Sequence, residues 1–265
     1  SFVDADDFIE KDALSLLIGA YNEKKADLII GNFRKIKNEV IEGRRDIQLK
    51  ENILFNKEDL IDYTRLYLKK PNKHLLFAFS WARLFKADII KDNDIHFNPD
   101  LHTFEDVAFN FDYIKNINSA HFIKDVVYNH VNYENYSSAT MNAGNNPEKL
   151  FGYLTALKNI GAFLKNNIPD DFIKREIGHA NTSLSIIQLI RTCGQMNTHN
   201  SREIYNLTKN LINNREVRTG LQFYSPSQGE SKAIPLLMNL RLVSPTIWLC
   251  KYKAHKRYKN LENKK

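Results

Sequence analysis

Apolar residues in the first half of the chain occur both as continuous runs and at helical spacing. Short runs rich in Val, Ile, Phe and Tyr predict buried strands, and apolar positions that repeat every three or four residues predict amphipathic helices. The predicted strands cover 26–30 and 121–133, and the predicted helices cover 9–21, 56–70 and 104–114. Mixed elements of this kind indicate an α/β fold, with helices packed on a sheet.

The pattern changes at Pro147, after which apolar residues recur mostly at helical spacing. The helices predicted from this spacing cover 150–163, 173–190 and 202–212. A further apolar stretch over 234–250 leads into a basic end. We therefore predict two parts, a mixed α/β part over 1–146 and a mostly α-helical part over 147–265.

The composition is that of a soluble globular protein, with 265 residues of which 43% are apolar and 26% charged. No run of about 18 uncharged apolar residues is present, so no bilayer-spanning helix is expected. The two cysteines, Cys193 and Cys250, lie far apart in the sequence, which argues against a disulfide framework. We expect both to be buried apolar residues of a protein in a reducing, cytoplasmic compartment.

The net charge of +7 is concentrated at the carboxyl end, because residues 251–265 contain seven basic residues and one acid. A basic tail is typical of proteins that bind anionic lipid or nucleic acid, and it also serves solubility alone. Aromatic residues beside these bases suit an interfacial helix on the inner face of the cell membrane. The alternative is a helix packed on the protein with a solvated basic end. The residues expected at the membrane contact are Trp248, Lys251, Lys253, Lys256 and Arg257.

Three carboxylates, Asp4, Asp6 and Asp7, directly follow the apolar pair Phe2 and Val3. A short buried strand that ends in carboxylates would place them at the carboxyl edge of a sheet, where open α/β sheets bind ligands. Carboxylates this close repel one another and favour a hard cation such as Mg²⁺ or Mn²⁺, which usually arrives with a phosphorylated substrate. The alternative is that Asp6 and Asp7 cap the helix that follows.

A second acidic segment, Thr103-Phe104-Glu105-Asp106, lies at the start of the predicted helix over 104–114. It fits a capping box in which Thr103 is the N-cap and the Asp106 side chain reaches back. The position also suits catalysis, because the amides of a first helical turn keep a carboxylate ionised. An ionised carboxylate beside a cleft can accept a proton from a sugar hydroxyl. The residues alone leave both interpretations open.

Four segments of the chain, in this order, resemble motifs of family 2 glycosyltransferases, which have the GT-A fold. The segments are Phe2-Val3-Asp4-Ala5-Asp6-Asp7-Phe8-Ile9, Trp81-Ala82-Arg83-Leu84-Phe85, Ile95-His96-Phe97 and Glu105-Asp106-Val107-Ala108-Phe109. They match the family patterns D-x-D-D, W-x-K/R-L-aromatic, i-x-F and E-D-x-x-F. The resemblance implies that 1–146 is the C-terminal part of a GT-A catalytic domain, and that a nucleotide-binding half precedes Ser1. The chain by itself is therefore expected to bind donor poorly or to be inactive.

Carried over to this sequence, the resemblance implies an inverting, metal-dependent transfer of a sugar from a nucleotide-diphosphate sugar to a hydroxyl of a glycan or lipid-linked acceptor. Asp106 takes the place of the general base, and Glu105 would contact the acceptor or position the base. Asp4 and Asp6 form the pair that holds Mn²⁺ or Mg²⁺, and Asp7 is a further candidate for donor or metal binding. The resemblance also implies a role in surface polysaccharide or glycan biosynthesis.

One further segment departs from the family pattern. A Y-x-Y-R strand often leads into an S-x-S/T loop that closes over the diphosphate, and here Tyr128 leads towards Ser138 and Thr140. Val131 stands near the place of the expected Arg, so His130 is the candidate for a phosphate or metal contact. The alternative is a half-buried strand His that makes a structural hydrogen bond.

Two other classes of protein fit parts of the sequence. A hydrophobic-D-x-D segment also opens phosphatases of the haloacid dehalogenase type, but these want Thr or Val where Phe8 stands. A non-catalytic module that binds a membrane surface or nucleic acid would use the basic tail. Because the charge lies in one short tail and no nucleic-acid-binding fold is recognisable, no nucleic acid is expected as a partner.

Overall fold

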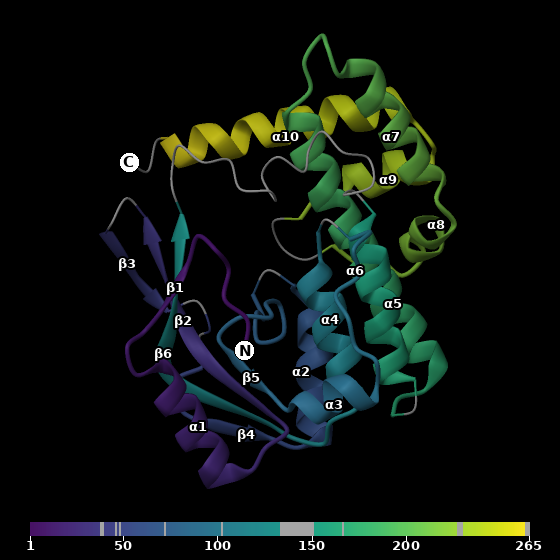
Figure 1. Cartoon of the computed structure of the whole chain (residues 1–265). Helices are drawn as coiled ribbons and strands as arrows, with labels where there is room; N and C mark the ends of the chain where they lie inside the picture. Colours follow the sequence, from purple (N-terminus) through teal and green to yellow (C-terminus); the bar gives the residue numbers. More distant parts are fainter. Residues whose placement is uncertain are drawn as a thin grey trace.

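The computed structural model describes residues 1–37, 40–45, 47, 49–71, 73–101, 103–132, 151–165, 167–226 and 230–262, with side chains except at 37, 40–45, 132 and 257–262. A twisted mixed sheet and four helices form the first part of the chain, and the helices α5 to α10 extend from its helical side (Figure 1). The α/β fold followed by a helical region is thus confirmed.

Two long parallel strands form the centre of the sheet, β2 (Leu28–Lys37) and β6 (Ala120–Asn132). They contain the apolar runs that predict strands. A Cβ on Gly31 would lie 2.2 Å from a Val127 methyl carbon, so the close approach of the two strands requires glycine here. Shorter strands flank them in antiparallel orientation: β1 (Phe8–Ile9) and β4 (Ile53–Phe55) beside β6, and β3 (Val40–Arg45) and β5 (Arg83–Phe85) beside β2.

The prediction of a buried strand at Phe2 and Val3 is wrong. Phe2 forms an isolated parallel bridge with Trp81, and Val3 is exposed. The carboxylates form a turn, closed by a hydrogen bond of 3.2 Å from the Asp7 amide to the Asp4 carbonyl oxygen. We call residues 4–7 the acidic turn. It precedes the flanking strand β1, so the carboxylates do not follow a central strand of the sheet.

The helices of the first part are α1 (Ala13–Lys24), α2 (Lys57–Lys69), α3 (Ala87–Asp92) and α4 (Glu105–Ile114). The helix α2 begins with a capping box, in which each of Asn56 and Asp59 accepts, on its side chain, a hydrogen bond of 3.0 Å from the backbone amide of the other. The apolar stripe predicted over 9–21 is only partly buried. Leu14 and Ile18 point to solvent, because α1 faces the sheet through its smaller residues and Leu17.

The helical region contains α5 (Gly152–Leu164), α6 (Asp170–Gly194), α7 (Ser201–Asn213), α8 (Arg215–Leu221), α9 (Ala233–Asn239) and α10 (Val243–Glu262). The three helices predicted after Pro147 correspond to α5, α6 and α7. The apolar stretch over 234–250 is divided into α9 and α10 by a turn at which Arg241 has a left-handed backbone, with φ of 56°. Within the described ranges, no helix has both the length and the apolar character needed to cross a bilayer.

The apolar core continues from the sheet into the helical region. One cluster of buried residues extends from Ala13 to Leu184, and a second extends from Ile186 to Ala254. The first half of α6 therefore packs with the sheet part, and its second half packs with α7 to α10. The division of the chain at residue 147 stays a prediction.

The two cysteines lie side by side, although they are distant in the sequence. Cys193 near the end of α6 and Cys250 on α10 are both fully buried, as predicted, and their thiols share a hydrogen bond. A Cβ on Gly194 would lie 2.7 Å from the Ala254 Cβ. This close approach of α6 and α10 requires a residue without a side chain.

Candidate functional site

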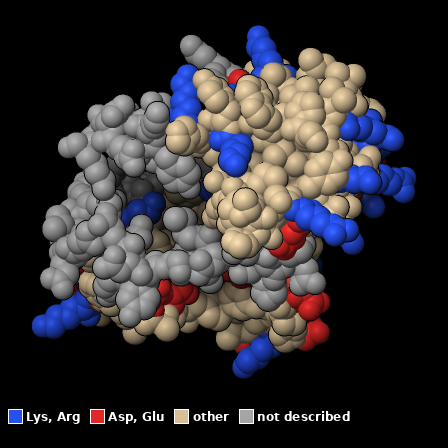
Figure 2. Space-filling view, turned by 90° about the horizontal axis from the view of Figure 1, so that it is seen from above, with Lys and Arg blue, Asp and Glu red and all other residues tan. Residues whose placement is uncertain are grey.

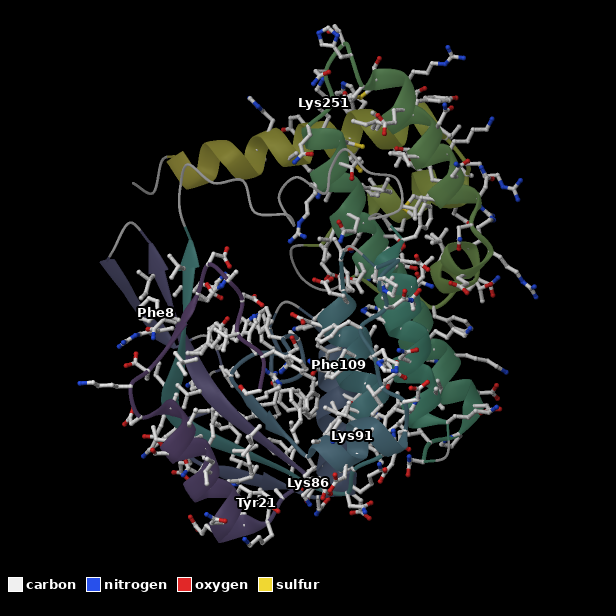
Figure 3. All side chains as sticks on the ribbon, in the orientation of Figure 1. Phe8, Tyr21, Lys86, Lys91, Phe109 and Lys251 are labelled. Carbon is white, nitrogen blue, oxygen red and sulfur yellow. The ribbon has the colours of Figure 1, made fainter. Side chains whose placement is uncertain are left out.

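Four phenylalanine rings join the segments that carry the family-like motifs. The Phe2 ring lies 5.6 Å from Phe85, 5.2 Å from Phe97 and 5.4 Å from Phe109, between ring centroids. Phe97 and Phe109 stack at 4.3 Å. Each ring comes from a different motif, and Phe109 points into the interior between sheet and helices (Figure 3). This aromatic cluster, as we call these four residues, fixes the acidic turn relative to the first turn of α4.

A second set of rings supports the acidic turn from the sheet. Trp81 is buried and stacks against Phe79 and Tyr128, with centroid distances of 4.4 Å to each. Its ring is also nearly parallel to that of His130, at 5.8 Å. Tyr128 and His130 lie two residues apart on β6, so both side chains project from the same face of the sheet. The rings therefore place two polar aromatic groups beneath the acidic turn.

Asp7 is held at every carboxylate oxygen. Tyr128 donates its hydroxyl proton to Oδ2 at 2.8 Å, the Val131 amide donates to Oδ1 at 2.8 Å, and His130 Nδ1 lies 3.2 Å from Oδ2. The Asp7 side chain is only 1% exposed. Burial by itself raises the pKa of Asp7, but the hydrogen bonds from His130, Val131 and Tyr128 outweigh it and lower the pKa. The Tyr128 hydroxyl also accepts a hydrogen bond of 3.0 Å from the Asp4 amide.

Asp4 has the opposite shift. Burial, and then the negative charges of Asp106, Asp7 and Asp6, raise the pKa of Asp4 to about 6. Asp4 and Asp106 are far apart in the sequence, so their interaction is a result of the fold. The structure thus brings together the four aspartates that the sequence singles out, with His130 near them as the opposing positive group.

Asp106 lies in the first turn of α4, as predicted, and is half-buried. Its Oδ1 accepts a hydrogen bond from the Ser80 hydroxyl. Burial raises the pKa of Asp106, while the hydrogen bonds from Ser80 and the charge of Arg83 oppose this rise. A carboxylate with a raised pKa is a stronger base than one in water, provided that the working pH still leaves it ionised.

Arg83 is a buried cation beneath Asp106. It is 1% exposed and donates from Nη1 to the Trp81 carbonyl oxygen at 2.6 Å and from Nη2 to the Leu76 carbonyl oxygen. Its Nε has no hydrogen-bond partner in the structure. Burial lowers the pKa of Arg83 to about 10, and Asp106 opposes this shift, so Arg83 stays protonated at neutral pH. Arg83 therefore supplies a fixed positive charge for the carboxylate above it.

A comparison of the sequence with protein-family models finds a match over residues 1–93, to the family described as Glycosyl transferase family 2. The match covers about a third of the chain and is what residues 1–93 are similar to. The recognition of this family is confirmed for the first two motifs, which carry the acidic turn, Trp81 and Arg83. The motifs at 95–97 and 105–109 lie beyond the matched residues.

Curated relatives align with a longer stretch of the chain than the family model does. The chain is 28% identical over 127 residues to the poly(ribitol-phosphate) beta-N-acetylglucosaminyltransferase TarS of Staphylococcus aureus strains MW2 and Mu50. The alignment covers 48% of this chain and 20% of each relative. The chain thus matches about one fifth of the length of these relatives.

Solved structures show the same fold. The structure of S. aureus TarS 1–349 in complex with UDP-GlcNAc matches 98% of this chain and 67% of its own, with a TM-score of 0.58 and 15% identity. A longer S. aureus TarS structure matches 95% of this chain and 39% of its own, with a TM-score of 0.58 and 14% identity. The fold expected from the GT-A resemblance is confirmed at this level.

The segment that matches family 2 ends before α4, and the start of α4 differs from the predicted capping box. The N-cap residue is Phe104, not Thr103, and no side chain caps it. The Asp106 carboxylate is hydrogen-bonded to Ser80. Phe104 and Ala82 both have left-handed backbones, with φ of 63° and 57°. Non-glycine residues in this region are strained, and such strain is common beside functional groups.

Sequence reasoning overlooked Ser80 and gave Tyr128 no role. Ser80 directly precedes the Trp81 motif, and Tyr128 lies in the strand that resembles Y-x-Y-R, so both stand next to recognisable patterns. Their partners, Asp106 and the acidic turn, are distant in the sequence, and no local periodicity reveals such pairs. Glu105 occupies the first turn of α4 and is half-buried. Ser138 and Thr140, the predicted diphosphate loop, lie outside the described residues.

The exposed carboxylates of the acidic turn suit a hard cation that is coordinated by the protein and by a bound ligand together. Among the described residues, no group of three or more His, Cys, Asp or Glu side chains is arranged to enclose a metal ion. Asp4 and Asp6 are exposed carboxylates, whereas both oxygens of Asp7 are already hydrogen-bonded. Mg²⁺ is commonly held by one or two carboxylates together with substrate phosphates and water. Burial first, and then the charges of Asp106, Asp7 and Asp6, raise the pKa of Asp4, and a bound cation would favour its ionised form.

Proposed function

We propose that this chain is part of an inverting, metal-dependent glycosyltransferase that moves a sugar from a nucleotide-diphosphate sugar to a hydroxyl acceptor. The observation that carries the proposal is that the fold brings Asp106 close enough to Asp4 for their negative charges to interact. The segment that matches family 2 supplies the acidic turn, and the fold brings to it a carboxylate from α4 that is bound to Ser80 and lies near a buried Arg. The alternative, a haloacid dehalogenase-type phosphatase, is disfavoured by Phe8, which stands where such enzymes want Thr or Val.

Asp4 and Asp6 are the proposed ligands of Mn²⁺ or Mg²⁺, and the ion would stabilise the diphosphate leaving group. Asp7 is assigned to positioning, because Tyr128, Val131 and His130 occupy both of its oxygens. It holds the acidic turn on β6, so that Asp4 and Asp6 face the ligand. His130 keeps its exposed edge for a phosphate contact and shares a hydrogen bond with Asp7.

Asp106 is the proposed general base. Partial burial makes its carboxylate more basic, and the Ser80 hydroxyl orients it. The positive charge of Arg83 favours the ionised carboxylate, because it opposes the rise in the pKa of Asp106. A single base that removes the acceptor proton during direct displacement gives inversion at the anomeric carbon. Glu105, which precedes it in the same turn, is the proposed acceptor contact.

The donor and acceptor classes are proposed from the relatives. TarS is named a poly(ribitol-phosphate) beta-N-acetylglucosaminyltransferase, and one of its structures holds UDP-GlcNAc. We therefore propose a UDP-sugar donor and a glycan or lipid-linked acceptor in cell-surface glycopolymer synthesis. This chemistry would take place on the cytoplasmic side, where nucleotide sugars are made.

The test is an assay of nucleoside diphosphate release. The protein that contains these residues, at its natural length, is incubated with Mn²⁺, a hydroxyl acceptor and a panel of UDP-, GDP- and TDP-sugars. We expect turnover with one donor, its loss on chelation, and a ~10²- to 10⁴-fold lower kcat for Asp106→Asn. Asp88→Asn, an exposed acid on α3, is the matched control and should retain wild-type turnover.

Two outcomes would contradict the proposal in different ways. Turnover that survives Asp106→Asn would remove the base assignment and leave the transferase. Absence of turnover with every donor, while the protein binds anionic vesicles, would favour the non-catalytic membrane module.

A further inference from the structure

The outer side of α10 exposes large aromatic side chains beside basic ones. Trp248 is 69% exposed and Tyr252 is 55% exposed, and their rings stack one helical turn apart at 6.0 Å. Lys251, His255 and Lys256 are exposed on the same side of the helix. Exposed apolar side chains that adjoin one another and are rimmed by polar residues mark interaction sites, whereas single exposed ones are ordinary.

The inner side of the same helix is fully used for packing. Ile247, Cys250 and Ala254 are buried in the second core cluster, against α6 and its neighbours. The Cys250 thiol shares a hydrogen bond with Cys193. The outer aromatic residues are therefore not left over from a poorly packed helix. They form a second, separate apolar side.

The apolar exposure continues from α10 onto α9 and the turn between them. Leu236, Leu240 and Leu242 are 58%, 57% and 42% exposed. Leu236 and Leu240 are four residues apart, so they lie on one side of α9 and its C-cap. We call Leu236, Leu240, Leu242, Trp248, Lys251, Tyr252 and Lys256 the α9–α10 face.

The charge of this segment has one sign. The chain contains no acidic residue between Glu230 and Glu262. The basic residues in that interval are Lys232, Arg241, Lys251, Lys253, Lys256, Arg257 and Lys259. The side chain of Arg257 is outside the described part of the structure. Figure 2, which looks down on the end of the molecule that carries α10, shows Lys and Arg around a broad uncharged area there, with few acids.

We propose that the α9–α10 face docks on an anionic membrane surface. Exposed Leu, Trp and Tyr side chains would enter the interfacial layer, where amphipathic aromatic rings are favoured. The lysines would remain at the level of the lipid phosphates, each contributing about 1 kcal/mol near a negatively charged leaflet. A protein partner would satisfy the apolar side chains, but an interval of seven bases without an acid is complementary to a continuous negative surface.

Docking in this way would also orient the candidate site. The acidic turn rests on the carboxyl half of β6, and that strand ends on the side of the molecule where α10 lies (Figure 1). A membrane that contacts α10 would therefore lie nearer to the site end of the sheet than to α1 and β4. The inference concerns membrane binding alone, and it stands whether or not the protein transfers a sugar.

The experiment is co-sedimentation of the full protein with vesicles. One set contains phosphatidylcholine alone, and the other contains about one third phosphatidylglycerol. We expect binding to the anionic set only, and its loss at an ionic strength of about 1 M, where the Debye length is about 3 Å. Lys251→Glu with Lys256→Glu should weaken binding at least about 30-fold, which corresponds to about 1 kcal/mol per lysine removed.

Matched variants separate docking from general effects. Lys11→Glu with Lys91→Glu makes the same charge change at two exposed residues outside α9 and α10. Figure 3 shows Lys91 and Lys251 in opposite parts of the molecule. Trp248→Ser with Tyr252→Ser should reduce binding, whereas Leu66→Ser, at an exposed apolar residue of α2, should leave it unchanged. Each variant should melt at the wild-type temperature, because these side chains are exposed.

Several outcomes would overturn the proposal. The first is no preference for anionic vesicles. The second is an equal loss of binding in the Lys11 and Lys91 variant. The third is self-association or nucleic-acid binding that depends on Trp248 and Lys251 and occurs without vesicle binding.

Discussion

The acidic turn and the α9–α10 face both gather charges of one sign, but they do so in different surroundings. In the acidic turn, partial burial and three neighbouring carboxylates raise the pKa of Asp4 to about 6. On α10, Lys251 and Lys256 lie on one exposed side of the helix, where solvent reaches both side chains. Repulsion between charges is strong where water is excluded and weak where ions screen it. The first region thus calls for a counter-ion at short range, and the second calls for an extended charged surface.

The two regions also differ in how they are held. The acidic turn depends on residues from distant segments, namely the aromatic cluster, Trp81 and Tyr128. The residues of the α9–α10 face are held in place from behind, because the inner sides of α9 and α10 pack in the second core cluster. Substitutions near the turn should therefore change both stability and the site. Substitutions on the face should change only what it contacts.

The largest effect is expected for Phe109→Ala. The ring is 2% exposed and contacts Phe2, Phe85 and Phe97. Removing it leaves a cavity, so the free energy of unfolding should fall by about 3–5 kcal/mol, as measured by denaturant unfolding. The acidic turn should also lose its fixed position relative to Asp106.

Leu240→Ala is the matched control for this substitution, because Leu240 belongs to the α9–α10 face and is 57% exposed. Its effect should stay within about 0.5 kcal/mol. Equal losses of unfolding free energy in the two variants would mean that the aromatic cluster is no more important for stability than the exposed face. The proposed difference between the two regions would then be wrong.

A smaller and opposite pair of effects is expected within the acidic turn. Asp7→Asn should lower the free energy of unfolding by about 1–3 kcal/mol at neutral pH. Val131 and Tyr128 donate to different oxygens of Asp7, and in Asn one of these oxygens is replaced by an NH₂ group, which cannot accept a hydrogen bond. Asp4→Asn should raise the free energy of unfolding, because it removes the cost of partly burying a charge and also the repulsion from Asp106, Asp7 and Asp6. We expect a gain of about 1 kcal/mol, since Asp4 is exposed and solvent screens the interaction.

The pH dependence distinguishes these two aspartates. The pKa of Asp4 is raised in the folded protein, so its protonated form stabilises the fold below pH 3.8, and this contribution is lost as the pH rises through about 6. The gain from Asp4→Asn should therefore appear above pH 6 and vanish below pH 3.8. The pKa of Asp7 is lowered, so its contribution is present above pH 3.8 and is lost as the pH falls through the folded-state value. Thermal melts across this range that show the same sign for both variants would contradict this assignment.

Much of the site was predictable because its residues lie in compact motifs. The order of D-x-D, W-x-R-L-F, I-H-F and E-D-x-x-F singled out Asp4, Asp6 and Asp106 as candidates, and two apolar runs predicted β2 and β6. The turn at residues 4–7 was not predictable in the same way. It forms because Phe2 packs with rings from three other motifs and Asp7 bonds to β6, and these contacts appear only once the chain has folded. Ser80 and the pairing of Cys193 with Cys250 were missed for the same reason.

The smallest effect, on vesicle binding, is expected from a disulfide that links Cys250 on α10 to Cys193 on α6. The two thiols are hydrogen-bonded, so oxidation by diamide should convert them to a disulfide, with the diazene accepting the two hydrogens. If the α9–α10 face docks through its outer side, α10 does not need to leave the core. The oxidised protein should then bind anionic vesicles as the reduced protein does.

Loss of both free thiols after denaturation would confirm the bridge, and Cys250→Ser, which cannot form it, is the control. If vesicle binding fell only when the bridge formed, the membrane contact would require α10 to detach, and the outer side would not be the docking surface.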